Sequence, residues 1–291
     1  MNHPEVFYKY ATAGTAIKVL ETSRLRWSSP LLFNDLFEFQ RMPSFEPSIA
    51  SSYPLLATTL VEVVFDGRDG IDHSRLTNTS RVLLSLVQRS RDAGRSREET
   101  LRSLAHDAPE SDSWFADQVR NTFLSEGNLE TARVLCVTTA FDNEAMWANY
   151  ADGHSGCVLG FRHLPEHDSP LLAAKQVSYS DGPPVVGSGL EFLLYGATAD
   201  FPKKVLEAIC YTKKTFWSYE REWRAITWRP AELDRKCGDY KFYPDELESV
   251  TVGPRANADT HEAVAALRSR YPQSSMFRLD VDRDRYRRIP L

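Results

Sequence analysis

The side chains with the clearest capacity for chemistry are concentrated in residues 217–224, which read Trp-Ser-Tyr-Glu-Arg-Glu-Trp-Arg. Alternate residues of a β-strand face the same side of a sheet, so a strand here would place Glu220, Glu222 and Arg224 on one face. A carboxylate partly removed from water beside an arginine has the environment in which active sites shift pKa values. The alternative interpretation is a structural ion pair of Arg224 with a carboxylate, Glu222 or Asp35.

A second group of candidate residues lies around 146–156. Met146, Trp147 and Tyr150 have helical spacing, and a polar turn that includes His154 follows them. Aromatic side chains beside polar groups are typical of the wall of a ligand pocket, although the same aromatics would also suit a hydrophobic core. A third group combines Ser28 and Ser29 with Asn34, and its polar groups could bind a substrate or form a turn. For Asn34 we expect the turn.

Several established kinds of site are absent from the sequence. It contains no phosphate-binding loop, no G-x-S-x-G motif and no dinucleotide fingerprint, which argues against kinases, serine hydrolases and Rossmann enzymes. His163 and His167 have the spacing of a helical metal pair, but Pro165 interrupts the helix that such a pair needs. We expect no metal site there. The cysteines are widely separated and are expected to be free thiols: Cys136, Cys157, Cys210 and Cys237.

The composition is that of a globular protein. The 291 residues are 42% hydrophobic and 26% charged, which excludes fibrous and disordered classes. A formal charge of -5 gives no general sign of a nucleic-acid binder. The sequence has no apolar run long enough to span a membrane, and its first ten residues lack the apolar region of a signal peptide. We therefore expect a cytoplasmic protein with no membrane partner.

Hydrophobic patterning predicts the elements that position these residues. Strands are expected near 6–10, 25–27, 134–139, 157–161, 176–179, 222–228, 250–252 and 276–279, with helices near 16–20, 201–211 and 258–271. Apolar residues between 54 and 127 recur at spacings of three and four, which predicts a helical insertion. We expect an α+β fold with residues 1–53 in the core, 54–127 as the insertion and 128–291 as the rest of the core.

Four sequence blocks together resemble domain-of-unknown-function family 2971. They are Tyr8-Lys9-Tyr10, the stretch from Leu25 to Phe37, the stretch from Met146 to Gly156, and the stretch from Trp217 to Arg224. The turn at 252–255, Val-Gly-Pro-Arg, is similar to the last block of the family. The family motif usually continues Asn-Asp-Pro, whereas this chain has Leu36 in place of the proline.

The order of elements is also similar to ADP-ribosyltransferases, which implies an ADP-ribosyltransferase-like mixed sheet and NAD as a substrate. By this resemblance Tyr8 or Tyr10 takes the first-strand position, although many of those enzymes have histidine there. Glu222, Glu220 and Tyr150 would be the catalytic residues. The residues expected to bind NAD are Tyr8, Tyr10, Ser28, Ser29, Trp147, His154 and Arg224.

The resemblance implies an enzyme that modifies a macromolecule, protein or nucleic acid, and that acts as a toxin or defence effector. Two alternatives come from other classes. One is a ligand-binding or interaction module of the same fold that lacks turnover. The other is a metal-dependent nuclease that uses Glu220, Glu222 and Asp35.

Overall fold

The computed structural model describes residues 3–105, 108–283 and 285–291. The chain forms two compact units. Unit 1 comprises residues 1–36, 127–181 and 213–291, and unit 2 comprises residues 37–126 and 182–212.

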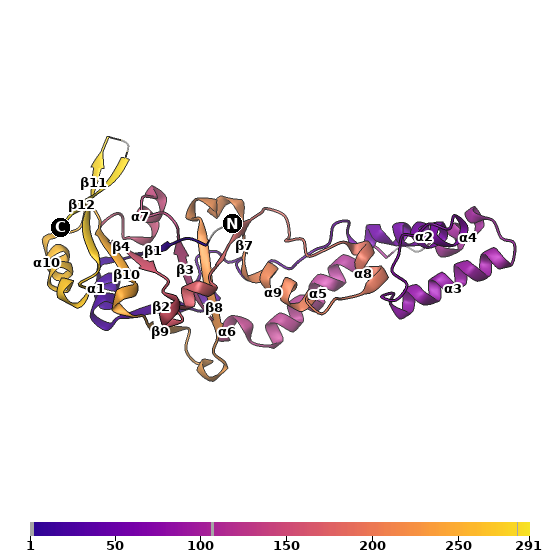
Figure 1. The fold of residues 1–291 in the computed structure, drawn as a ribbon, viewed down its shortest axis with the longest axis horizontal. Coiled ribbons are helices and arrows are strands. Elements are labelled where there is room, and N and C mark those ends of the chain that lie inside the picture. The colour runs from indigo at the N-terminus through magenta and orange to yellow at the C-terminus, as the bar shows by residue number, and fades with distance from the viewer. Residues whose placement is uncertain (1–2, 106–107, 284) are drawn as a thin grey trace. The chain divides into compact units, whose positions relative to one another are not determined.

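Unit 1 contains the β-sheet and the helices that pack on it (Figure 1). Its strands are β1 (Val6–Ala11), β2 (Arg24–Ser28), β3 (Ala132–Thr138), β4 (Cys157–Arg162), β5 (Lys175–Gln176), β6 (Ser178–Tyr179), β8 (Glu222–Trp228), β9 (Cys237–Lys241), β10 (Leu247–Val252), β11 (Ser275–Asp282) and β12 (Arg285–Pro290). Strand β7 (Thr212–Lys213) begins at the last residue of unit 2. The α-helices are α1 (Ala13–Thr22), α6 (Asn128–Thr131), α7 (Glu144–Tyr150) and α10 (Ala258–Ala266). Short 3-10 helices are η1 (Pro30–Leu32), η2 (Pro165–His167), η3 (Pro170–Ala173), η4 (Thr215–Glu220), η5 (Pro230–Glu232), η6 (Pro244–Glu246) and η7 (Arg268–Arg270).

The main sheet is mixed. Its strand order is β12-β11-β10-β4-β1-β3-β2-β9, and β8 pairs with both β3 and β5. The pair β10–β11 is parallel, and the others with a described register are antiparallel. Strand β3 pairs with β8 along its whole length, whereas β1 and β2 each meet it at one described position, Tyr8 with Thr138 and Ser28 with Val134.

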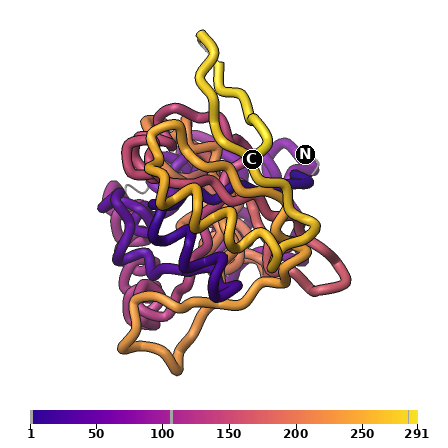
Figure 2. Tube along the Cα trace, turned by 90° about the vertical axis from the view of Figure 1, so that its left-hand side faces the viewer, coloured from indigo at the N-terminus to yellow at the C-terminus, as the bar shows by residue number. Residues whose placement is uncertain are grey.

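One face of this sheet carries the main hydrophobic core. Helix α1 begins after the Thr12 cap and buries Ala16, Val19 and Leu20 against the sheet. Helix α10 begins after the Asn257 cap and adds Val264 to the same core. Figure 2 shows α1 in indigo beside α10 in orange on this side of unit 1. The sheet supplies apolar side chains that include Phe7, Leu135, Leu159, Phe161, Val250 and Val252.

The opposite face contains a row of residues that runs directly across five strands. Tyr8 pairs with Thr138 on one side and with Gly160 on the other. Thr138 pairs in turn with Glu222, and Gly160 pairs with Ser249. Residues directly opposite one another in a sheet share a face. The fold therefore places a glutamate, a threonine, a tyrosine, a glycine and a serine in one line.

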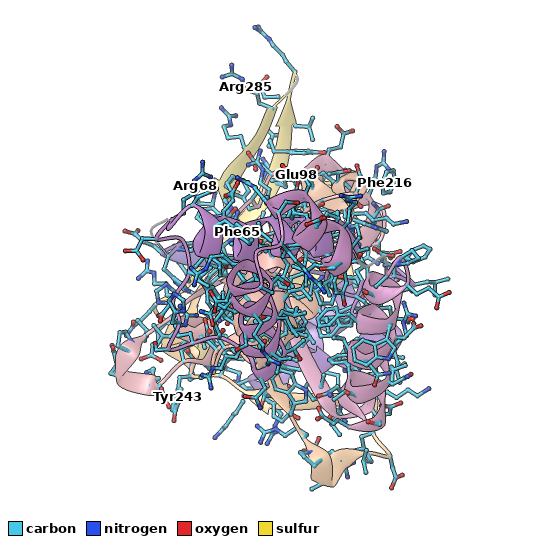
Figure 3. All side chains as sticks on the ribbon, turned by 90° about the vertical axis from the view of Figure 1, so that its right-hand side faces the viewer. Phe65, Arg68, Glu98, Phe216, Tyr243 and Arg285 are labelled. Carbon is cyan, nitrogen blue, oxygen red and sulfur yellow. The ribbon has the colours of Figure 1, made fainter. Side chains whose placement is uncertain are left out.

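Unit 2 is helical. It contains α2 (Ile49–Phe65), α3 (Asn78–Asp92), α4 (Arg97–Leu104), α5 (Ser111–Ser125), α8 (Gly189–Tyr195) and α9 (Phe201–Cys210). Arg97 at the start of α4 donates to Asp66 at the end of α2, at 2.8 Å. Phe65, Arg68 and Glu98, labelled in Figure 3, mark this region. The core of α2, α3 and α8 is built from Leu56, Leu60, Val61, Leu84, Val87 and Leu194, with neighbouring apolar residues.

The helical unit extends beyond the insertion expected from the sequence. Unit 2 begins at Phe37, upstream of the expected residue 54, and also takes in residues 182–212. The physical reason is that α8, far away in the sequence, shares an apolar core with α2 and α3 through Leu194. The expected helical character of 54–127 is confirmed by α2, α3, α4 and α5.

The α+β class is confirmed, with several local corrections. The strand expected at 176–179 is divided into β5 and β6, and α10 ends at Ala266 before the short helix η7. Strands β7, β9 and β12 were not predicted from the sequence. Among the described residues, none of the helices combines the length and apolarity needed to cross a membrane.

The cysteines are free thiols that differ in their surroundings. Burial raises the pKa of the Cys157 and Cys210 thiols to about 12. The pKa of the Cys136 thiol is raised well above its usual value by burial and by the nearby Glu222 carboxylate. Cys237 is half-buried in β9.

Because the thiolate is the reactive form, we expect iodoacetamide at pH 8 to alkylate Cys237 first in the folded protein. The other three thiols should react only after unfolding in urea, as followed by peptide mass spectrometry. Alkylation of Cys157 at the rate of Cys237 in the folded protein would contradict this expectation.

Candidate functional site

Glu220 and Glu222 come together through a turn. Glu222 is the first residue of β8, as expected, but Glu220 is the last residue of η4 and lies outside the strand. Arg221 between them has a φ of 46°, which is the left-handed conformation. The prediction that strand alternation places both glutamates on one face is therefore wrong for Glu220. The turn at Arg221 brings both carboxylates to a common partner instead.

That partner is Lys213, which sequence reasoning missed. Its Nζ donates to Oε2 of Glu220 at 2.6 Å and to Oε2 of Glu222 at 3.2 Å. All three side chains are at most 6% exposed. The ring of Trp217 lies below the same ammonium, 4.7 Å from its centroid. We call Lys213, Glu220, Glu222 and Arg224 the carboxylate cluster.

Arg224 holds Glu222 from the other side. Its Nε donates to Oε1 of Glu222 at 2.8 Å and its Nη2 donates to Oε2 at 3.0 Å. This two-point contact confirms the predicted pairing of Arg224 with Glu222. Burial lowers the pKa of the fully buried Arg224 to about 9, an effect that the charge of Asp35 opposes. The guanidinium therefore stays charged at neutral pH.

Burial and charge act in opposite directions in this cluster. Burial raises the pKa of Glu222, and the positive charge of Lys213 acts against that shift. For Lys213, burial alone would lower the pKa, but the charges of Glu222 and Glu220 leave it above its ordinary value. The backbone N–H of Glu222 donates to the hydroxyl of Tyr179 at 2.8 Å. Glu222 is thus fixed by its backbone as well as by its side chain.

Tyr150 joins the cluster at Glu220. Its hydroxyl donates to Oε1 of Glu220 at 2.5 Å. Burial, together with this hydrogen bond, raises the pKa of the Tyr150 hydroxyl. Helix α7 positions Tyr150, and the Asn143 side chain caps that helix by accepting from the N–H of Met146. Asn143 also donates to the carbonyl of Tyr219 at 2.5 Å, which ties α7 to η4.

The other predicted aromatic residues form a separate packed group. Trp147 is fully buried, and its Nε1 donates to the carbonyl of Phe141 at 2.8 Å. Tyr10 contacts Trp147 edge to face, and its hydroxyl donates to the carbonyl of Ala140. The ring of His154 is nearly parallel to that of Trp147, and its Nε2 contacts the hydroxyl of Tyr286 at 3.1 Å. The polar atoms of Tyr10 and Trp147 are thus hydrogen-bonded within the fold.

The structure places the two predicted serines where β2 meets η1. Ser29 is fully buried, donates to the carbonyl of Leu129 at 2.6 Å and caps η1. Ser28 is the last residue of β2, where it pairs with Val134 and Cys237. Of the two alternatives, the side chain of Ser29 has the role of a turn cap.

Tyr8 is the first-strand residue that aligns with the carboxylate cluster. In the row across the sheet only Thr138 separates Tyr8 from Glu222. Two strand spacings correspond to about 10 Å between the backbones. Tyr8 is half-buried, and its ring contacts Phe141 edge to face.

An open cleft of about 680 Å³ adjoins the cap of α7. Its lining includes Asp142, Asn143, Glu144, His154 and Arg221. The residues that line this cleft do not include Glu222, Tyr150 or Trp147. The contact between Asn143 and Tyr219 nevertheless links the cleft to the segment that carries Glu220.

Cationic side chains contact three of the four carboxylate oxygen atoms of the two glutamates. Lys213 and Arg224 together contact Oε2 of Glu220 and both oxygens of Glu222. Among the described residues, none of the His, Cys, Asp and Glu side chains form a group of three that could hold a metal ion. The contacts of Glu220 and Glu222 are therefore those of ion-paired carboxylates and not those of metal ligands.

Comparison with known proteins identifies one family. Residues 146–225 match the family described as "Protein of unknown function (DUF2971)". This match confirms the predicted family resemblance over a segment that begins just before Tyr150 and ends just after Arg224. No curated protein and no solved structure matches the chain.

Proposed function

We propose that this chain, whose residues 146–225 carry the DUF2971 pattern, cleaves the bond between nicotinamide and ribose in NAD and transfers ADP-ribose to a macromolecule. The observation that carries the proposal is the row in which Tyr8 and Glu222 share one face of the sheet, with only Thr138 between them. A second support is Tyr150, which contacts the neighbouring carboxylate of Glu220.

The reaction needs few protein groups. When the C1′–N bond breaks, its electron pair leaves with nicotinamide, and the ribose develops positive charge like that of an oxocarbenium ion. A fixed carboxylate stabilises such charge, because it needs no reorganisation during the reaction. In this proposal Glu222 is that carboxylate, and Arg224 and Lys213 hold it in place.

The remaining residues have supporting roles. Tyr8 packs against the nicotinamide ribose, and Tyr150 positions Glu220. Glu220 accepts the proton of the acceptor nucleophile as that atom bonds to C1′. The carboxylate of Glu220 lies between the Tyr150 phenol and the Lys213 ammonium, where it can take up this proton. For the transfer, the hydrogen bond from Lys213 to Glu220 must weaken.

Incubation of the full chain with NAD tests the proposal. We expect release of free nicotinamide, measured by chromatography, and transfer of the ADP-ribose group to protein or nucleic acid when a suitable acceptor is supplied. Without an acceptor, water should take its place and free ADP-ribose should accumulate. Saturable NAD binding without nicotinamide release would overturn the catalytic proposal and support a binding module of the same fold.

A further inference from the structure

A second polar site lies on the same face of the sheet, around Gly160. A Cβ atom at this position would lie 2.5 Å from Oγ of Ser249, 3.0 Å from Oε2 of Glu248 and 3.1 Å from a ring carbon of Tyr8. Such distances are too short for any larger residue without displacement of these neighbours. Glycine therefore allows three polar or aromatic side chains to converge on one point of β4.

An irregularity in β10 turns Glu248 toward this point. Leu247 pairs with Phe161 and Ser249 pairs with Gly160, so Glu248 is an extra residue in the pairing with β4. A β-bulge of this kind redirects a side chain, and bulges are common beside functional sites. Without the bulge, alternation would place Glu248 and Ser249 on opposite faces. With it, both side chains approach Gly160.

Three oxygen atoms at this site are buried without a hydrogen-bond partner in the part of the chain that the structure describes. They are Oε2 of Glu248, Oγ of Ser249 and Oγ1 of Thr251. The Ser249 and Thr251 side chains are fully buried, and Thr251 lies two residues along the same face. A buried polar atom without a partner is costly for the folded state. Three such atoms give this face an unmet demand for hydrogen-bond partners.

Arg288 reaches the same region from β12. Its guanidinium lies 3.9 Å from the centroid of Phe141, 5.0 Å from that of Tyr8 and 5.3 Å from that of Phe277. Phe277 is the cross-strand neighbour of Thr251. The Nε and Nη2 atoms of Arg288 are also buried without a partner among the described residues. This edge of a guanidinium binds phosphate or carboxylate with two parallel hydrogen bonds.

We propose that this site binds the ribose phosphate group of a nucleotide. A carboxylate next to hydroxyl groups accepts hydrogen bonds from a sugar diol, and a guanidinium edge donates to a phosphate. A simple anion would be repelled by Glu248, and a simple cation would be repelled by Arg288. A ligand with both sugar hydroxyls and a phosphate satisfies both residues. The inference deepens the proposed function, because NAD contains ribose phosphates, and it rests on that function for the identity of the whole ligand.

Calorimetric titration of the full chain with AMP tests the inference without any turnover. We expect Glu248→Gln and Arg288→Gln each to weaken AMP binding by about tenfold or more. Arg287→Gln is the matched control, because Arg287 is the exposed neighbour of Arg288 on the same strand, and it should change affinity less than twofold. Ribose 5-phosphate should bind at the same site, whereas adenosine should bind more weakly for lack of the phosphate.

Thr251→Val separates ligand binding from a structural role. The substitution removes a hydroxyl without a partner and keeps the shape of the side chain, so the thermal midpoint should not fall. AMP binding should weaken. Equal AMP affinity in Thr251→Val, Glu248→Gln and the original chain, or no AMP binding by the original chain, would overturn the inference.

The two proposals fail in different ways. If AMP binds as expected but NAD is not cleaved, the proposed function is wrong and the ribose phosphate site stands. If NAD is cleaved and AMP binding does not depend on Glu248 or Arg288, the enzyme proposal stands and this site is wrong.

Discussion

Replacement of Glu222 by glutamine is expected to lower nicotinamide release by about two to four orders of magnitude. Glutamine keeps the size of the side chain but removes the negative charge that the proposed reaction requires at C1′. The single carbonyl oxygen of the glutamine can still accept a hydrogen bond from Arg224 or Lys213. Neither cation then faces a negative charge at position 222. The loss should appear in kcat more than in KM, because the charge interaction strengthens in the transition state.

Glu262→Gln is the matched control for this experiment. It makes the same chemical change at an exposed position of α10 and should leave the rate unchanged. Nicotinamide release is measured at saturating NAD, and circular dichroism confirms that both variants are folded. A folded Glu222→Gln variant with the original turnover would remove Glu222 from the mechanism.

Local sequence patterns predicted the elements that bear the site. The apolar and polar spacing around 222–228 indicated β8, and the spacing of Met146, Trp147 and Tyr150 indicated α7. Glu222, one of the two carboxylates expected to pair with Arg224, also followed from local alternation, because both residues lie in the same strand. Signals of this kind depend only on neighbouring residues.

The partners of these residues could not be found in the same way. Lys213 lies in β7, separated from Glu222 by η4, and no spacing rule links a lysine before a 3-10 helix to a strand after it. The alignment of Tyr8 with Glu222 depends on the registers of two strand pairs. Each register is set by packing across the whole sheet, which a single sequence does not display.

The same reasoning explains why Tyr10 and Tyr8 could not be distinguished in advance. They lie two residues apart in β1 and share a face, so alternation treats them alike. The position of α7 distinguishes the two tyrosines. Trp147 of α7 packs against the ring of Tyr10, and the hydroxyl of Tyr10 donates to the carbonyl of Ala140. Tyr8 occupies the row that contains Glu222.

Arg224→Ala is expected to destabilise unit 1 by about 3–5 kcal/mol. The side chain is fully buried, so its removal leaves a cavity and deprives the Glu222 carboxylate of its two-point partner. Lys213 alone must then compensate a carboxylate that is already disfavoured by burial. The stability of Arg224→Lys should lie between that of Arg224→Ala and that of the original chain. A lysine keeps the charge but cannot form the parallel pair of hydrogen bonds.

Arg221→Ala provides the control, since it removes the same side chain from an exposed position three residues earlier. We expect a loss below about 1 kcal/mol for this variant. Unfolding in urea can be followed by tryptophan fluorescence, which reports mainly on unit 1, because Trp114 alone of the tryptophans lies in unit 2. Equal midpoints for Arg224→Ala and Arg221→Ala would show that the buried pair does not stabilise the fold. In that case Arg224 could not be the residue that fixes Glu222, and the geometry proposed for the reaction would lose its support.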